Sequence, residues 1–214
     1  MNETLALILI LLAIAVASYL IGGVNPAIIM SKLVYHEDIR EKGSGNPGFT
    51  NFKRVYGNNP LSWSVMLLDI VKAALPVCIS AIILKNTYDM WQFGAAFSGF
   101  FAMFGHCFPI WYDFKGGKAF MAGFATTWFV DYRMALIAML VFFIVLAVWK
   151  YMSVASCTAS VTCPIALFFL KPDSLWVWIL CLISALLVIV RHYPNFKKLK
   201  AGTESKFSLK KDKK

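Results

Sequence analysis

The chain has 214 residues, of which 59% are hydrophobic, and its mean hydropathy is +0.67. Its repeated apolar runs are too long for the helices of a soluble core, which excludes an ordinary soluble enzyme. The formal net charge is +10 at pH 7, and a membrane surface accounts for this excess without nucleic acid. We predict an all-α integral membrane protein with one transmembrane domain, residues 1–207, and a basic tail, residues 208–214.

Apolar segments divide the chain into helices. The first lacks a basic leader and a small-residue cleavage site, so we expect a retained helix rather than a signal peptide. A span needs about 20 residues, and several of the later segments are shorter than this. We predict a bundle of seven transmembrane helices, and five full spans with short or re-entrant helices remain the alternative. The segments are 4–30, 61–84, 93–112, 119–130, 134–149, 154–170 and 174–190.

The positions of the cations test this alternation. If seven spans alternate, 17 of the 21 Lys and Arg residues fall on one side, in the segments 31–60, 113–118, 150–153 and 191–214. Cationic loops stay in the cytoplasm, so this distribution predicts an N-terminus outside the cell and a C-terminus inside it. The same side holds the glycine-rich and polar stretches, and such backbone is tolerated at a membrane only where it lines a cavity.

The first of these stretches is GSGNPGFTNFKR, residues 43–54. Its glycines allow backbone N–H groups to turn toward one point, and Thr50 to Arg54 resembles the first turn of a helix that could hold an anion. We predict a phosphate pocket, with an ordinary glycine-rich turn as the alternative. The glycine spacing also matches GxGxxG, but no buried strand precedes it, which excludes a dinucleotide site.

The second stretch repeats the anion pattern. Lys115 and Lys118 flank Gly116 and Gly117, and this arrangement predicts a backbone nest for a phosphoryl group. It is not a Walker A loop, because the required first glycine and the hydroxyl are missing. The alternative is that both lysines only anchor a helix at the lipid headgroups.

The third and fourth stretches supply hydroxyl and imidazole groups. Ser153 and Ser156 share one helix face, as do His192 and Asn195. Alone, each would be read as a helix cap or an interfacial residue, but their common side favours one shared site. Within the second span, Asp69 and Lys72 are three residues apart, so we expect them to neutralise one another.

Together the stretches resemble the bacterial acyl-phosphate:glycerol-3-phosphate acyltransferase family. Its loops resemble GSGNxGATNxxR, GHxFPxxxxFKGGKG, a tyrosine-serine motif and HRxNIxRLxxGTE, which match residues 43–54, 105–119, 150–156 and 192–204 in the same order. Similarity runs from SYLIGG near residue 18 to GTESK at residue 202. The departures are Phe49 and Ala119, where the family usually has alanine and glycine, and the Tyr193–Pro194 pair.

The resemblance implies transfer of a fatty acyl group from acyl phosphate to the sn-1 hydroxyl of glycerol 3-phosphate, in the first acylation step of phospholipid synthesis. The products would be lysophosphatidic acid and phosphate, formed at the cytoplasmic face of a bacterial inner membrane. Both substrates and the lipid bilayer are the expected partners. We expect no cofactor, no metal, no nucleic acid and no obligate protein partner.

Candidate site residues follow from these motifs. Acyl phosphate is already activated, so we expect direct attack by the glycerol hydroxyl without a covalent acyl-enzyme. Its proton would go to His192 or to the acyl phosphate itself. The runner-up function is a membrane carrier for an organic phosphate, although no internal repeat is visible. Catalytic candidates are Ser44, Ser153 and His192; substrate-binding candidates are Gly45, Asn46, Thr50, Asn51, Arg54, His106, Lys115, Gly116, Gly117, Lys118, Asn195 and Glu204.

Overall fold

The computed structural model describes residues 2–170 and 172–208. Within these ranges the chain is built from α-helices with two short 3₁₀ turns, η1 and η2. The predicted basic tail lies outside the described residues, except for Ser208. The elements are α1 (Glu3–Gly23), α2 (Pro26–Tyr35), η1 (Ile39–Glu41), α3 (Phe49–Tyr56), α4 (Pro60–Tyr88), α5 (Trp91–Cys107), η2 (Ile110–Tyr112), α6 (Phe120–Val130), α7 (Tyr132–Trp149), α8 (Met152–Leu170), α9 (Leu175–Arg191) and α10 (Tyr193–Lys200).

Each predicted apolar segment is helical, the first of them as two helices, α1 and the start of α2, and this confirms the predicted all-α membrane fold. In the described chain, five helical segments are long and apolar enough to cross a membrane, and α9 makes a sixth when it is counted together with α10. The exception is α6, whose 11 residues rise only about 17 Å, well short of a bilayer core of about 30 Å. The five-span alternative with short helices therefore describes the structure best.

Helix ends follow local sequence signals. The side chain of Asn59 accepts a hydrogen bond from the Ser62 N–H, and Pro60 occupies the first helical position of α4. Asn25 and Pro26 repeat this pattern at the start of α2. The first apolar segment is therefore broken next to Val24, because Asn25 begins a new helix where the run of apolar residues would continue the old one.

The centre of the bundle is α5, which contacts α1, α4, α6 and α9. Its small residues allow close approach of helix backbones, as is typical of membrane helices. A Cβ atom added at Gly105 would lie 2.1 Å from the Tyr19 carbonyl oxygen of α1, and one added at Gly99 would lie 2.1 Å from Thr126 of α6. A hydrogen bond of 2.8 Å between the Ser18 and Ser98 hydroxyls also joins α1 to α5.

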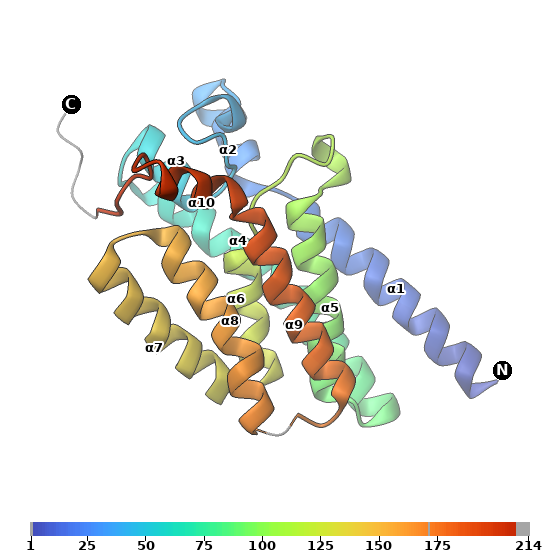
Figure 1. The fold of residues 1–214 in the computed structure, drawn as a ribbon. Coiled ribbons are helices and arrows are strands. Elements are labelled where there is room, and N and C mark those ends of the chain that lie inside the picture. The colour runs from blue at the N-terminus through green and yellow to red at the C-terminus, as the bar shows by residue number, and fades with distance from the viewer. Residues whose placement is uncertain (1, 171, 209–214) are drawn as a thin grey trace.

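Polar connections gather at one end of the bundle. Figure 1 shows α2, α3, α10 and the loop between α5 and α6 at the end opposite the N-terminus. The chain bends by 48° between α9 and α10, so α10 lies across this end instead of extending the bundle. The four sequence stretches with polar and glycine-rich residues therefore meet at a single end.

Packing of α5 against α1 provides a test of the fold. We expect Gly105→Ala to destabilise the protein by about 1–3 kcal/mol, the usual cost of overpacking, because the obstructing Tyr19 carbonyl belongs to the backbone. Gly123→Ala is the matched control, since its new methyl group would meet only the flexible end of Met103. Both substitutions gain the same helix propensity. Thermal unfolding in detergent micelles measures the difference, and equal midpoints would contradict the packing argument.

Candidate functional site

Two adjoining cavities lie beneath the polar end. One has a volume of about 490 Å³ and mainly polar residues around it, and the other has a volume of about 910 Å³ and a mostly apolar lining. Phe49, Phe120, Met121, Met152 and Phe207 belong to the walls of both. The predicted site residues that line the polar cavity are Ser44, Asn46, Thr50, Asn51, Arg54, His106, Lys118, Ser153, His192, Asn195 and Glu204.

The first glycine-rich loop is shaped by Asn51. Its side-chain oxygen accepts from the Ser44 N–H at 2.8 Å, and its amide nitrogen donates to the Lys42 carbonyl at 3.0 Å. Gly43 has a φ of +58°, and a Cβ atom there would lie 2.4 Å from the same Asn51 oxygen. These hydrogen bonds give the Asn51 side chain a structural role in the loop, and its predicted contact with substrate stays a prediction.

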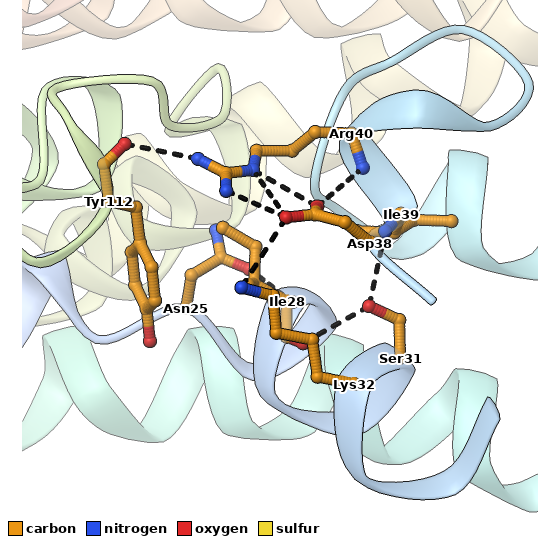
Figure 2. Close-up of polar contacts among 8 residues, drawn as sticks. All are labelled: Asn25, Ile28, Ser31, Lys32, Asp38, Ile39, Arg40 and Tyr112. Atoms are coloured by element: carbon orange, nitrogen blue, oxygen red, sulfur yellow. Dashed lines mark hydrogen bonds and ion pairs between the residues drawn. The ribbon is translucent and has the colours of Figure 1, made fainter. Parts of the chain in front are cut away.

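A second contact anchors this loop to the next one (Figure 2). The Arg40 guanidinium donates to both carboxylate oxygens of Asp38 and, through Nη1, to the Tyr112 carbonyl at 3.1 Å. The hydrogen bonds from Arg40 lower the pKa of the Asp38 carboxyl to about 2. Ser31 accepts from the Ile39 N–H at 3.2 Å and fixes the other side of η1. The first two motifs are thus held together from outside the cavity.

The start of α3 faces the polar cavity. Gly48 precedes this helix and offers no side-chain cap, so the first N–H groups of α3 lack the usual capping oxygen. Thr50 and Arg54 are four residues apart, lie on the same helix face and both line the cavity. A helix N-terminus, a hydroxyl and an exposed guanidinium suit an anion, as the sequence predicts.

The second motif differs from its prediction. The Gly116 and Gly117 N–H groups donate to the Cys107 and His106 carbonyls at 3.2 and 2.9 Å, so they form no nest for a phosphoryl group. These glycines and the exposed Lys115 do not line the polar cavity, and neither does Gly45 of the first motif. Both amide donors bond to carbonyls at the end of α5, so the predicted substrate-binding roles of Gly116 and Gly117 stay predictions that these N–H groups do not support.

Lys118 is the cation of this motif that reaches the cavity. It donates to the side-chain oxygen of Asn195, whose amide nitrogen donates to Glu204 at 2.7 Å. Burial lowers the pKa of the Lys118 ammonium to about 8, with Lys198 and Arg54 lowering it further and Glu204 opposing them. Glu204 therefore orients the Asn195 side chain, and Asn195 in turn holds the partly buried Lys118 ammonium at the cavity.

Two side chains in the polar cavity have unused hydrogen-bonding capacity. Ser153 is buried, and its hydroxyl makes no hydrogen bond within the described part of the chain. His192 is also buried, and its Nδ1 lies 2.8 Å from the Val188 carbonyl oxygen. Since a carbonyl only accepts, Nδ1 carries the proton and Nε2 of the neutral ring keeps a lone pair. Ser153 and His192 are thus suited to contact a ligand.

Sequence reasoning did not assign several residues that line the polar cavity, among them Asp69 and Phe207. Asp69 borders the polar cavity and, as predicted, pairs with Lys72, at 2.8 Å. Phe207 closes the boundary between the two cavities, where its ring lies 4.5 Å from the Lys53 ammonium and its N–H donates to the Lys150 carbonyl at 2.6 Å. The charge of Asp69 inside a predicted span is a signal of function in the sequence. A single aromatic residue such as Phe207, at the end of the predicted domain, gives no such signal.

Comparison with known proteins identifies the family. The family model described as glycerol-3-phosphate acyltransferase matches residues 12–202. The chain belongs to the glycerol-3-phosphate acyltransferase family. Relatives with this name include one from Thermoanaerobacter sp. (strain X514), 37% identical over 198 residues that cover 92% of this chain and 95% of the relative. Another, from Colwellia psychrerythraea, is 36% identical over 95% of this chain and all of the relative.

Solved structures of the family share this architecture. The crystal structure of PlsY, an integral membrane glycerol 3-phosphate acyltransferase, in its glycerol 3-phosphate form has a TM-score of 0.82 and 29% sequence identity, and the match covers 92% of this chain and 96% of PlsY. The lysophosphatidic acid form of PlsY has a TM-score of 0.79 and 28% identity over 93% and 96% of the two chains. The predicted family and the integral membrane fold are both confirmed.

Titration of Lys118 tests the polar cavity. The ammonium is charged below its pKa of about 8 and neutral above it, so we expect affinity for inorganic phosphate to fall as pH rises through this value. The loss should be on the order of 10-fold, the effect of one charge-assisted hydrogen bond. In Lys118→Arg, phosphate affinity should not fall over this pH range, since a guanidinium stays protonated.

Calorimetric titration with inorganic phosphate at a series of pH values measures this effect. Lys115→Arg is the matched control, because Lys115 is exposed and outside the cavity. A pH profile that moves with Lys115→Arg and not with Lys118→Arg would contradict the assignment.

Proposed function

We propose that this chain transfers a fatty acyl group from acyl phosphate to the sn-1 hydroxyl of glycerol 3-phosphate, releasing lysophosphatidic acid and phosphate. The observation that carries this proposal is the shared wall between a polar cavity with cationic side chains and a larger apolar cavity. An acyl phosphate has the same division, since its phosphate requires polar ligands and its hydrocarbon chain avoids water. Its reactive carbonyl then lies where the two cavities meet.

Each substrate group has a matching region. Arg54 can clamp a phosphate through two N–H groups, and Lys118 acts as a point charge that offsets negative charge on the leaving phosphate. Ser44 and the unpartnered Ser153 hydroxyl contribute neutral donors near the reacting centre. The acyl chain occupies the apolar cavity, where Met134, Ala138 and Leu180 line the walls.

The reaction is a single acyl transfer. The glycerol hydroxyl oxygen attacks the carbonyl carbon of acyl phosphate, and the bond between this carbon and the phosphate oxygen breaks. An ester forms, and phosphate leaves with the bond's electron pair. The hydroxyl proton is taken by His192, whose Nε2 lone pair is available because Nδ1 donates to Val188, or by an oxygen of the acyl phosphate.

We also propose that the site faces the cytoplasm of a bacterial inner membrane. In the sequence, the segments 31–60, 113–118, 150–153 and 191–214 contain 17 of the 21 Lys and Arg residues, and such loops are retained on the cytoplasmic side. Glycerol 3-phosphate is charged and soluble, so this orientation delivers it from the aqueous phase while the acyl chain remains in lipid.

Purified protein with acyl phosphate and radiolabelled glycerol 3-phosphate tests the function. We expect labelled lysophosphatidic acid, and at least about a 10-fold lower kcat/KM for Arg54→Ala and for Lys118→Ala, because each loses a charge-assisted phosphate contact worth about 1.5 kcal/mol or more. Lys115→Ala should lose less, since Lys115 lies outside the cavity. Lys85→Ala, at an exposed site on α4, is the control.

The outcome also separates the rival function. Uptake of label into vesicles without lysolipid would indicate a carrier, and neither uptake nor product would contradict both functions. If Lys115→Ala and Lys118→Ala were equally impaired, the assignment of Lys118 as the cation of this motif would be wrong.

Direct transfer has its own test. With acyl phosphate alone, we expect no acyl group on Ser44 or Ser153, because the donor already carries a good leaving group and needs no enzyme ester. Mass spectrometry of the intact protein after rapid quenching would detect the added acyl mass. A stable ester on either serine that transfers to glycerol 3-phosphate would replace direct transfer with a two-step route.

A further inference from the structure

A buried lysine in α4 makes three polar contacts with different parts of the chain. Lys72 Nζ lies 2.8 Å from Asp69 Oδ1, 2.8 Å from His106 Nδ1 and 2.6 Å from the Val24 carbonyl oxygen at the end of α1. All three side chains are less than 10% exposed. The contacts with Val24 and His106 are hydrogen bonds, whereas the contact with Asp69 is an ion pair, since Asp69 Oδ1 makes no hydrogen bond within the described residues.

This arrangement fixes the proton on His106. Lys72 donates and cannot accept, so His106 Nδ1 must be the acceptor and the neutral ring carries its proton on Nε2. Nε2 lies against Gly117, where an added Cβ atom would approach it to 2.2 Å. His106 borders the polar cavity, and within the described residues its Nε2 makes no hydrogen bond. The neutral ring therefore keeps an N–H donor that the described residues do not use, in a side chain at the border of the polar cavity.

The other histidine of the cavity has the opposite arrangement. The Val188 carbonyl accepts from His192 Nδ1, which leaves a lone pair on Nε2. The cavity thus contains one imidazole that donates and one that accepts. Phosphate oxygens need donors, whereas a hydroxyl that loses its proton needs an acceptor.

We propose that Lys72, with Asp69, is a positioning residue that holds His106 in its Nε2–H form, so that His106 donates a hydrogen bond to a substrate phosphate. This inference rests on the proposed acyltransferase function. It assigns the buried Lys72–Asp69 pair a role in addition to the neutralisation of two charges within the membrane. With the proton on Nδ1 instead, the lone pair of Nε2 would face the phosphate oxygens and repel them.

Nitrogen NMR tests the tautomer without an activity assay. The chain has three histidines, so ¹⁵N-histidine labelling gives three side chains, which are assigned with His106→Gln and His192→Gln. We expect the proton on Nε2 in His106 and on Nδ1 in His192. A proton on Nδ1 of His106 would overturn the proposal, even if the protein proves to be an active acyltransferase.

Activity measurements test the role of the pair. Removing Lys72 alone would leave Asp69 buried and unpaired, so the variant to use is Lys72→Met with Asp69→Asn, which stays neutral. Lys85→Met with Asp89→Asn removes the exposed Lys–Asp pair at the far end of the same helix and is the matched control. We expect kcat/KM to fall on the order of 10-fold in the first variant and to stay within about twofold in the control.

A double-mutant cycle separates positioning from mere stability. If Lys72 acts through His106, removing the pair should have little further effect in a His106→Gln background, because glutamine donates without a fixed tautomer. An equal loss in both backgrounds would overturn the proposal. If the Lys72→Met, Asp69→Asn variant does not fold, the His106 tautomer measured in the wild-type protein still supports or overturns the proposal. Absence of any lysolipid product from the wild type would instead contradict the proposed function.

Discussion

The site depends on four hydrogen bonds of the Gly116–Gly117 backbone. Its two N–H groups donate to carbonyls at the end of α5, and its two carbonyls accept from the Arg191 guanidinium at 2.9 and 3.0 Å. Because Arg191 is followed by His192, this contact places the end of α9 beside the second motif. An added Cβ atom at either glycine would lie within 2.2 Å of His106. Any other residue at position 116 or 117 would therefore clash with His106 and disturb these hydrogen bonds.

Much of the fold can be predicted from composition. A membrane requires each backbone polar group to be satisfied locally, so long apolar runs must become helices. Their alternation brings the polar stretches to one end, and the four motifs do line a single cavity there. The break next to Val24, inside the predicted segment 4–30, does not follow from composition, because it depends on the Asn25 cap. The length of α6 depends on where the Gly116–Gly117 loop lets a helix begin.

The site residues whose roles the sequence leaves open share one physical feature. Sequence shows which groups can donate hydrogen bonds, but not which already do so. Asn51 and the Gly116–Gly117 amides have suitable chemistry for phosphate, yet they satisfy neighbouring backbone groups instead. The same ambiguity applied to Lys115 and Lys118, which are equivalent in the motif. Only the turn before α6 directs Lys118 inward and leaves Lys115 exposed.

The boundary between the two cavities explains where the departures from the family pattern have their effect. Phe49 is buried, packs 4.9 Å from the Trp63 ring and lines both cavities. A phenyl ring is larger than the alanine of the family motif, so Phe49 narrows the boundary between the two cavities, while Arg54 and Lys118 line only the polar cavity. Phe49 therefore changes the shape of the boundary between the two cavities and leaves the cationic side chains of the polar cavity in place.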